Sequence, residues 1–347
     1  MSCKKFDFNH KDIYLLLGPQ EVGKTCFLGG LYYAFRSALN GFSLSCVNDE
    51  QRVELDDMCK NLEEGIFPFG TSGSTDYQFV LRYAHQERFS FEWFDYRGGM
   101  LAEYGTKNHI EYQELTDIVK NSTCILICVD GTWLSSDKDK CVKNIQDKGY
   151  AVNEFLDKYR DSNGILPPIC IVITKYDKCD SRYETEYFEA IKESFAFFED
   201  SNAPIFICPI SIGREKNEKF IFDPTDTDVY RPLFFALWCG YNYRVAGLKQ
   251  NLKNKKKIFT PLLNELNDEI KKLENATLVI NKQKKIEEKK QDISKCNSLL
   301  KKEEERIDTL ECEQKKLLET ICASEDIYWG TERTTWEEVE DKWKFFH

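Results

Sequence analysis

The sequence predicts an α/β fold, with a mostly parallel sheet flanked by helices, followed by an α-helical coiled-coil arm and a short C-terminal helix. Short apolar runs alternate with longer amphipathic ones over residues 1–248. Residues 249–323 contain no glycine and are rich in Lys, Glu, Leu and Ile. Residues 324–347 are aromatic and acidic. We expect these three segments to be the domains of the chain.

Apolar runs that alternate with amphipathic ones are typical of a parallel sheet covered by helices. We expect strands at residues 13–17, 77–84, 89–96, 124–130, 169–174 and 205–211. We expect helices at 24–38, 49–64, 103–120, 139–160, 182–199 and 229–246. The polar HQER turn predicts that two of these strands form an antiparallel hairpin, which would place one antiparallel strand at the edge of the sheet.

The arm is expected from a heptad repeat. A first set of apolar residues alternates between a and d positions: Phe259, Leu263, Leu266, Ile270, Leu273 and Ile280. A second set continues the repeat in a different register: Ile286, Ile293, Leu300, Ile307, Leu310 and Leu317. The two registers do not match, so the segment is either one long helix with an irregularity or an antiparallel helical hairpin. We expect a homo-oligomer or a protein partner to bind through this coiled coil and the tail.

The tail is expected to end in an amphipathic helix. Thr334 and Glu337 have the spacing of a capping box. Trp336, Val339, Trp343 and Phe346 would then lie on one face of the helix. This helix either docks on the chain's own body or binds a partner.

The composition excludes some classes of function. A formal net charge of -11 argues against a general nucleic-acid binder, because phosphate backbones attract basic surfaces. The 14 cysteines show no zinc-ligand spacing, and several lie in apolar strands. With no N-terminal apolar signal, this pattern fits the cytoplasm. No apolar run approaches the roughly 20 residues of a spanning helix, so a membrane role is not expected, although the lysine-rich run 253–257 would favour one.

The stretch GPQEVGKT, residues 18–25, follows an apolar strand and fits a phosphate-binding loop. Gly18 and Gly23 allow the backbone to wrap closely around phosphates. Lys24 can reach the outer phosphates, and the hydroxyl of Thr25 can ligate Mg²⁺. The residues expected to contact the phosphates are Gly18, Gln20, Glu21, Val22, Gly23, Lys24, Thr25 and Cys26.

Two further strands end in residues suited to a nucleotide. Asp95 begins a D-x-x-G pattern that ends at Gly98, so its carboxylate would hold Mg²⁺ through water and the Gly98 N–H would sense the γ-phosphate. Thr174, Lys175 and Asp177 follow the strand at 169–174. The Asp177 carboxylate can accept hydrogen bonds from N1–H and the 2-amino group of guanine, which adenine lacks.

The next strand ends in Pro-Ile-Ser, and Ser211 with Ile212 is expected to close over the guanine base. All these residues follow predicted strands, in agreement with the position of ligand sites in open α/β sheets. The expected cofactors are therefore GTP or GDP with Mg²⁺.

The stretches GPQEVGKT, DYRGG, TKYD and PIS resemble those of the translation-factor-related (TRAFAC) class of GTPases, with a Ras-like or dynamin-like G domain over residues 12–245. The resemblance implies the P-loop NTPase fold, a preference for guanine nucleotides and a need for Mg²⁺. Thr174 stands where Asn is commoner. The GIFPFGT segment and DYRGG also resemble G domains of bacterial conflict and defence systems. The resemblance covers neither the arm nor the tail.

The residues for hydrolysis depart from the Ras-like pattern. Thr71 is expected to contact Mg²⁺ and the γ-phosphate, with Thr75 as the alternative. Gly99 occupies the position at which Ras-like enzymes carry a glutamine that orients the attacking water. Other groups must then position the water, and Gln20 is one candidate because some dynamin-like loops carry Gln there. Further candidates are Glu21, Arg97 and Glu103. The expected catalytic set is Lys24, Thr71, Gln20, Gly98 and Gly99.

The sequence therefore predicts a slow GTPase that acts as a molecular switch, controls the coiled-coil arm or a partner, and is helped by dimerisation or a partner. A GTP-bound scaffold that does not hydrolyse the nucleotide is the alternative. A dynamin-like membrane-associated GTPase is the third possibility.

Overall fold

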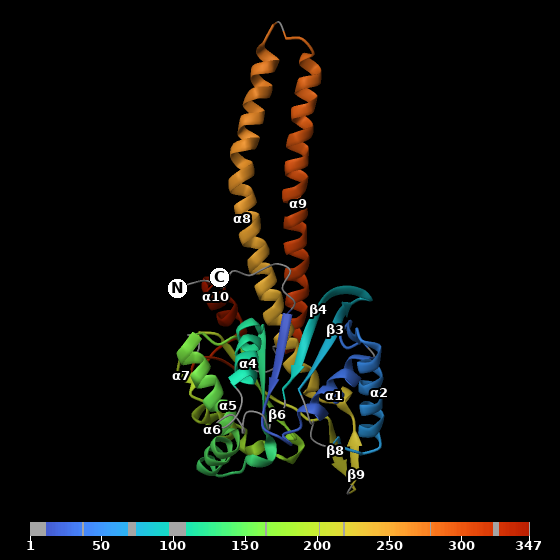
Figure 1. Cartoon of the computed structure of the whole chain (residues 1–347), viewed down its shortest axis with the longest axis vertical. Helices are drawn as coiled ribbons and strands as arrows, with labels where there is room; N and C mark the ends of the chain where they lie inside the picture. Colours follow the sequence, from blue (N-terminus) through green and yellow to red (C-terminus); the bar gives the residue numbers. More distant parts are fainter. Residues whose placement is uncertain are drawn as a thin grey trace. The chain divides into compact units, whose positions relative to one another are not determined.

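The computed structural model describes residues 12–36, 38–68, 74–96, 109–163, 165–200, 202–217, 219–277, 279–321 and 326–346. The chain divides into two compact units. The first, here called the body, comprises residues 9–240 and 318–346. The second, here called the arm, comprises residues 241–317. The body contains the sheet, and the arm consists of two long helical segments (Figure 1).

The described part of the body contains a sheet in the order β11-β10-β7-β6-β5-β1-β4-β3-β2. The central strands β7, β6, β5, β1 and β4 pair in parallel, and the strands on either side pair antiparallel. The strands are β1 (Asp12–Leu17), β2 (Phe42–Cys46), β3 (Thr75–Tyr83), β4 (Gln86–Asp95), β5 (Cys124–Asp130), β6 (Ile169–Thr174), β7 (Pro204–Pro209), β10 (Ile327–Trp329) and β11 (Glu332–Arg333). A separate hairpin is formed by β8 (Gly213–Lys216) and β9 (Lys219–Phe222). The mostly parallel sheet confirms the predicted fold class.

Helices flank this sheet. They are α1 (Lys24–Arg36), α2 (Asp49–Glu63), α4 (His109–Asn121), α5 (Lys138–Asn163), α6 (Glu184–Ser194), α7 (Phe197–Asp200) and α10 (Trp336–Phe346). The long helices α8 (Arg231–Asn275) and α9 (Lys282–Ile321) form the arm over residues 241–317. Asn48 caps α2, since its side chain accepts hydrogen bonds from the backbone N–H groups of Glu50 and Gln51. Among the described residues, no helix has both the length and the apolar character needed to cross a bilayer.

The core of the body lies along the central strands. Every residue of β5 and of β6 is buried. A strand covered by helices on both faces has no solvent-facing side, which explains why CILICVD and ICIVIT are almost continuously apolar. The cysteines in these strands, Cys124, Cys128 and Cys170, pack as small apolar residues.

The edge of the sheet differs from the prediction. The antiparallel hairpin of β3 and β4 is present, but β2 pairs with β3, so β3 is not the edge strand. The segment FSLSC was not predicted as a strand. Its residues alternate between buried and half-buried positions, and five residues are too few to reveal that period in the sequence alone. The neighbouring strand therefore determines its conformation.

The tail belongs to the body. β10 pairs antiparallel with β7 and extends the sheet. Trp336 of α10 contacts the rings of Phe206 and Trp238, with centroids 5.4 and 5.6 Å apart. Trp343 contacts Trp238 at 5.4 Å. Of the two interpretations of the tail helix, docking on the chain's own body is the one observed.

The cap of the tail helix lies one residue later than predicted. α10 begins at Trp336. The Thr335 hydroxyl accepts a hydrogen bond from the backbone N–H of Glu338 at 3.2 Å. The Thr334 hydroxyl instead donates to the Glu338 carboxylate at 2.5 Å. With adjacent threonines and adjacent glutamates, spacing alone could not distinguish the two capping pairs.

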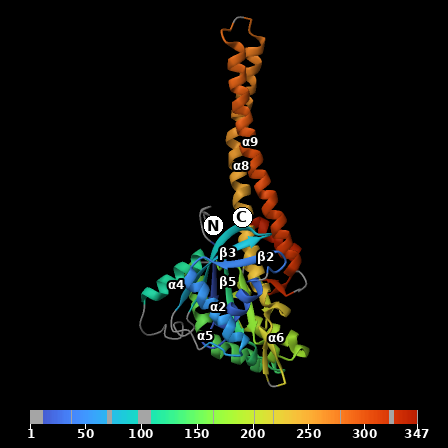
Figure 2. The ribbon, with the colours of Figure 1, turned by 90° about the vertical axis from the view of Figure 1, so that its right-hand side faces the viewer.

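The arm is an antiparallel helical hairpin and not one long helix. α8 and α9 lie side by side in both views (Figures 1 and 2). Ion pairs join them along their length: Lys249–Glu311 at 2.5 Å, Lys255–Glu303 at 2.6 Å, Lys256–Glu304 at 2.7 Å and Lys289–Glu269. Most predicted heptad residues lie half-buried or buried along the seam: Phe259, Leu263, Leu266, Ile270, Leu273, Ile286, Ile293, Leu300, Ile307, Leu310 and Leu317.

The turn of the hairpin contains neither glycine nor proline. Asn281 adopts a left-handed conformation with φ 60°, which Asn tolerates better than most residues. The Lys282 ammonium donates to the carbonyl oxygens of Glu274 and Ala276, at 2.8 and 2.9 Å, and so satisfies groups left free where α8 ends. Ile280, predicted in the seam, is 86% exposed. That prediction was wrong, because α8 ends at Asn275 before the repeat reaches Ile280.

Candidate functional site

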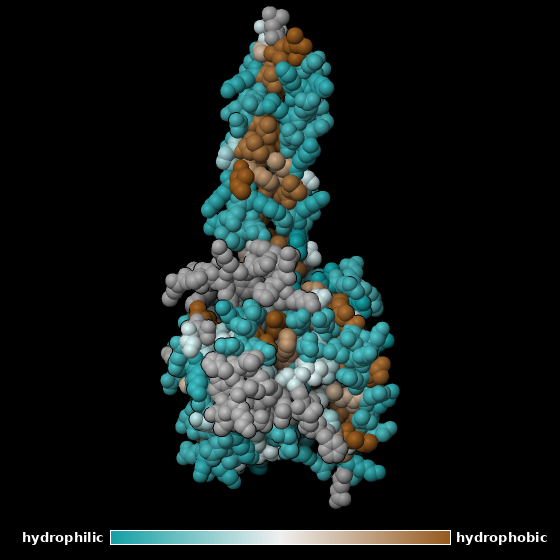
Figure 3. Space-filling model, in the orientation of Figure 1, coloured by the Kyte–Doolittle hydropathy of each residue, from teal (hydrophilic) through white to brown (hydrophobic). Residues whose placement is uncertain are grey.

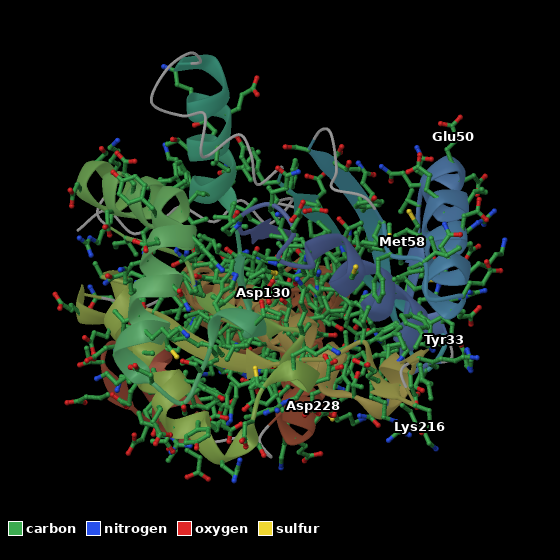
Figure 4. All side chains as sticks on the ribbon, turned by 90° about the horizontal axis from the view of Figure 1, so that it is seen from below. Tyr33, Glu50, Met58, Asp130, Lys216 and Asp228 are labelled. Carbon is green, nitrogen blue, oxygen red and sulfur yellow. The ribbon has the colours of Figure 1, made fainter. Side chains whose placement is uncertain are left out.

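The candidate site lies where the parallel strands end. β1 pairs with β4 on one side and with β5 on the other, so the connections diverge in opposite directions from β1. Such a point opens a crevice beyond the carboxyl ends of the strands. The last residues of β4, β5 and β6 are Asp95, Asp130 and Thr174. Figure 4 shows the body from below, with Asp130 near the centre of the view.

The loop from β1 to α1 is tightly wound. Gly18 has φ 153° and Gly23 has φ 89°. A Cβ atom on Gly18 would lie 3.1 Å from both the Cβ and the carbonyl oxygen of Cys128. Glu21 also has a positive φ, of 65°. This loop therefore needs glycine at its first position, and it leads directly into the N-terminus of α1, where anions are favoured.

The Lys24 side chain folds over this loop. Its ammonium donates to the carbonyl oxygens of Gly18 and Pro19, both at 2.8 Å. Lys24 is only 6% exposed. Burial lowers the pKa of Lys24, while the nearby Cys128 and Asp95 act in the opposite direction. A buried cation is thus held at the mouth of the loop.

Asp95 is a buried carboxylate beside this lysine. It is 4% exposed, and burial raises its pKa to about 6, although Lys24 lowers it. Its Oδ1 atom is buried and has no hydrogen-bond partner among the described residues. A buried oxygen without a donor suits a hydrated cation. Thr25 lies in the first turn of α1, half-buried.

These residues fit Mg²⁺ in the way a nucleotide site requires. Mg²⁺ is usually held by one or two protein oxygens together with phosphate oxygens and water. Within the described ranges, no group of three or more His, Cys, Asp or Glu side chains could hold a metal by itself. Thr25 and Asp95 could supply only part of the coordination, and a phosphate ligand would supply more.

Thr174 and Lys175 tie the end of β6 to the loop between β1 and α1, which the sequence predicts to be a phosphate loop. The Thr174 hydroxyl donates to the Val22 carbonyl oxygen at 2.5 Å. The Lys175 ammonium donates to the Glu21 carbonyl oxygen at 3.0 Å and to Asp130 Oδ2 at 2.6 Å. Lys175 has φ 53°, a left-handed conformation that costs a residue with a Cβ atom free energy. These contacts hold the Lys175 side chain across the phosphate loop.

Asp177 and Ser211 meet at the ends of β6 and β7. The Ser211 hydroxyl lies 3.4 Å from Asp177 Oδ1. The backbone N–H of Tyr176 donates to the Ile210 carbonyl oxygen at 3.1 Å and joins the two loops. Ile212 lies against Gly30 of α1, where a Cβ atom would come within 2.6 Å of Ile212 Cγ2. The predicted TKYD and PIS motifs thus lie together.

Asp130 lies at this site too, although no sequence motif predicted it. Its Oδ1 accepts hydrogen bonds from the Thr132 N–H at 2.9 Å and the Thr132 hydroxyl at 2.7 Å, while its Oδ2 accepts from Lys175. A Cβ atom on Gly131 would lie 2.7 Å from the Thr174 carbonyl oxygen, so this glycine permits the close approach. The available signal was an acidic residue ending a fully apolar strand, at the same edge as Asp95.

Several predicted residues cannot be placed. Thr71, Gly98 and Gly99 lie outside the described residues, as do Arg97 and Glu103.

Other predicted residues lie within the described part. The alternative residue Thr75 begins β3, directly opposite Asp95 in the antiparallel register. Gln20 and Glu21 are exposed on the phosphate loop. Burial raises the pKa of the Cys26 thiol to about 11, so this thiol is protonated at neutral pH.

Comparisons with known proteins gave few similarities. No family model matches the chain, and no curated protein matches it by sequence. A solved structure of an SsGBP mutation variant covers 58% of this chain with 14% identity and a TM-score of 0.29. The GTP-bound Ski7 GTPase-like domain of S. cerevisiae covers 58% with 16% identity and a TM-score of 0.34. Sup35 complexed with GDP covers 60% with 11% identity and a TM-score of 0.28.

This chain covers 50%, 43% and 40% of the lengths of those three structures. TM-scores below 0.5 at such identities establish neither a family nor a function. The assignment of the site therefore rests on the chain's own residues.

Proposed function

We propose that this protein binds guanine nucleotides with Mg²⁺ and acts as a slow cytoplasmic GTPase switch. One observation carries the proposal: Lys175 joins the phosphate loop, through Glu21, to the loop that contains Asp177. A phosphate site and a base site are thereby joined at one edge of the sheet. A nucleoside triphosphate requires such an arrangement, with one site for its phosphates and another for its base.

At the phosphate end, the loop from Gly18 to Cys26 would bind the phosphates through its backbone and through Lys24. Thr25 and Asp95 would hold Mg²⁺, with Thr71 or Thr75 contributing a further hydroxyl. The cation would neutralise phosphate charge. Asp95 favours this role because it already lies beside Lys24 with one oxygen unpaired among the described residues.

At the base end, Asp177 would accept hydrogen bonds from N1–H and the 2-amino group of guanine. Ser211 lies close enough to Asp177 to orient this carboxylate. The stem of Lys175 would cover the face of the base, since its ammonium is held by Glu21 and Asp130. Ser211 and Ile212 would close over the base from the end of β7.

Hydrolysis is proposed to be slow because Gly99 has no side chain with which to orient water. Gln20 is exposed on the phosphate loop and is the candidate for that role, together with Gly98 at the γ-phosphate. Contacts with the γ-phosphate would order the segments around residues 71 and 98–99. Their order would in turn control the arm or a protein partner.

Calorimetric titration with GTP, GDP and a non-hydrolysable ATP analogue, with Mg²⁺ and with EDTA, tests the binding proposal. GTP and GDP should bind, EDTA should weaken GTP binding, and the ATP analogue should not bind. The variant Lys60→Ala is a matched control, because Lys60 is exposed on α2 and pairs with nearby Asp57. Equal binding of GTP and the ATP analogue would contradict the proposed role of Asp177.

A GTP-bound scaffold without hydrolysis is the second candidate, favoured by the glycine at position 99. Single-turnover hydrolysis at several protein concentrations separates the two functions. A switch helped by dimerisation should hydrolyse GTP faster as the protein concentration rises. A scaffold should bind GTP without releasing phosphate at any concentration.

A further inference from the structure

Besides Ile280 at the turn, three large apolar side chains are exposed along the described part of the arm. Ile258 is 67% exposed, Leu262 41% and Leu299 50%. Figure 3 shows apolar side chains gathered about halfway along the hairpin, on the face turned toward the viewer. The seam between α8 and α9 is formed mainly by other residues, so a large part of each of these three side chains lies outside that packing.

The three side chains share one face of the hairpin. Ile258 and Leu262 are four residues apart on α8 and therefore neighbours on its surface. The Lys255–Glu303 ion pair sets the level across the hairpin. Ile258 lies three residues after Lys255 on α8, and Leu299 lies four residues before Glu303 on α9. Because the helices are antiparallel, Ile258 and Leu299 lie at about the same height along the arm.

Helix geometry places Ile258 and Leu299 on the same side. Each directly precedes a half-buried seam residue, Phe259 on α8 and Leu300 on α9. One residue corresponds to about 100° of rotation. Because α8 and α9 run in opposite directions, this step turns both side chains toward the same face. We call Ile258, Leu262 and Leu299 the arm patch.

Charges on this face are distributed unequally about the arm patch. Toward the open end of the hairpin lie Lys302 and Arg306, three and seven residues after Leu299. Toward the turn lie Asp292, seven residues before Leu299, and Glu265, three residues after Leu262. All four are exposed.

The turn side also carries Lys295, which lies 3.4 Å from Asp292, and Lys289, which forms an ion pair with Glu269 across the hairpin. Glu288, one turn beyond Asp292, adds a further carboxylate. Among the described residues, Glu265, Glu288, Lys302 and Arg306 belong to no ion pair. The turn side of the patch is therefore net acidic, and the open side is basic.

We propose that the arm patch binds a second copy of this chain, arm against arm and antiparallel, about a two-fold axis that passes near Leu299. A two-fold interface requires a patch that complements itself. Asp292 and Arg306 lie seven residues on either side of Leu299. In the antiparallel arrangement, Asp292 of one copy therefore lies opposite Arg306 of the partner subunit, and apolar side chains meet at the centre.

A parallel dimer, with its two-fold axis along the arm, would bring like charges together instead of opposite charges. α8 would then lie against the partner's α9 with the two turns at the same end. Glu265 would lie level with Asp292 of the partner subunit, so carboxylates would oppose carboxylates. Like charges at this distance disfavour the parallel dimer. The charge pattern selects the antiparallel one.

The proposal supplies a partner for the proposed switch, yet it rests on arm residues alone. The dimer should form without nucleotide, and its failure would leave the nucleotide site untouched. Three apolar side chains form a small interface, so the dissociation constant should be on the order of 10 µM.

Sedimentation velocity of the full chain without nucleotide, over a range of concentrations, tests the dimer. The wild type should shift from monomer to dimer. Leu299→Glu should weaken the dimer by about 100-fold, since it buries a charge in the centre of the interface. Ile280→Glu is the matched control, because Ile280 is exposed at the turn and outside the patch. Circular dichroism should show unchanged helicity in both variants.

Charge reversal tests the direction. Asp292→Arg and Arg306→Asp should each weaken the dimer by about tenfold, and the double variant should restore it. In the parallel dimer, Asp292→Arg would instead strengthen association by meeting Glu265. A monomer at all concentrations, an unaffected Leu299→Glu dimer, or strengthening by Asp292→Arg would each overturn the proposal.

Discussion

The body and the arm use charged residues in opposite ways. In the body, Lys24 and Asp95 are 6% and 4% exposed and lie beside each other at the end of the central strands. In the arm, Lys256 and Glu304 form an ion pair whose side chains are 50% and 46% exposed. A surface pair contributes little to stability, whereas burying a charge costs free energy. At the candidate site the body accepts that cost for Lys24, Asp95 and Asp130, which are all buried.

Apolar residues show the same contrast. Ile171 in β6 is fully buried, and so is every residue around it in that strand. In the arm most seam residues are only half-buried, and Ile258 is mainly exposed. The body therefore has an extensive apolar core of its own, while the arm leaves part of its apolar surface exposed. The following predictions test this difference, from the largest expected effect to the smallest.

Replacing a core residue of the body should have the largest effect. Ile171→Ala should lower the free energy of unfolding by about 4 kcal/mol, because it removes a buried side chain and leaves a cavity. Ile258→Ala, the matched change in the arm, should lower it by less than about 0.5 kcal/mol. Urea denaturation of dilute protein measures both. Equal losses would show that the arm has a core like that of the body.

The buried lysine should matter for ligand binding far more than a surface lysine. Lys24→Ala should weaken GTP binding by about 100-fold, since a charged hydrogen-bond donor to phosphate is lost. Lys256→Ala on the arm should leave GTP binding unchanged. Calorimetry of both variants gives the comparison. Wild-type affinity in Lys24→Ala would remove the phosphate loop from the binding site.

The buried carboxylate should reduce stability in the absence of nucleotide. Because the pKa of Asp95 is raised from 3.8 to about 6 in the folded protein, the folded state binds a proton more tightly than the unfolded state. Its contribution is fully favourable below about pH 4 and is lost as the pH rises through 6. Asp95→Asn should therefore stabilise the nucleotide-free protein by about 3 kcal/mol at pH 7.5.

Thermal unfolding of wild type and Asp95→Asn from pH 4 to 8 measures this effect. The difference in stability should shrink toward zero as the pH falls to 4. The same variant should lose the Mg²⁺ dependence of GTP binding. A destabilised Asp95→Asn at pH 7.5 would mean that ionised Asp95 is well compensated in the folded protein.

Asp130 should have a smaller effect through Lys175. Asp130→Asn removes the charge that holds the Lys175 ammonium and should weaken GTP binding by about tenfold. Asp137→Asn is the control, because Asp137 lies in the loop before α5 and does not contact Lys175. If Asp130 acts by positioning Lys175, the double variant Asp130→Asn with Lys175→Met should bind GTP no more weakly than Lys175→Met alone. Additive losses would assign Asp130 a separate role.

The sequence predicted most of the elements that build the site. Continuous apolar runs revealed β5 and β6, because both of their faces are buried. The motifs after β1, β4, β6 and β7 appeared as contiguous residues. β2, by contrast, depends on pairing with β3, and β10 on pairing with β7. Long-range pairing of short strands leaves little trace in local sequence.

The same limit applies within the site. Asp130 matches no contiguous motif, and its partner Lys175 lies 45 residues further along the chain. The turn of the arm could not be predicted either, because it contains no glycine or proline. Asn281 instead adopts the left-handed conformation, and Lys282 binds a carbonyl oxygen at the end of α8. Contiguous motifs can be read from a sequence, while contacts between distant side chains need the fold.

The central claim is that Asp177 selects guanine. Calorimetric titration of the wild type and Asp177→Asn with GTP, XTP and a non-hydrolysable ATP analogue tests it most directly. The wild type should bind only GTP, because its carboxylate accepts from both guanine donors. The variant should lose GTP and bind XTP, since an amide N–H can donate to the 2-oxo group of xanthine. Unchanged GTP affinity in Asp177→Asn, or tight binding of the ATP analogue to the wild type, would contradict the proposed site.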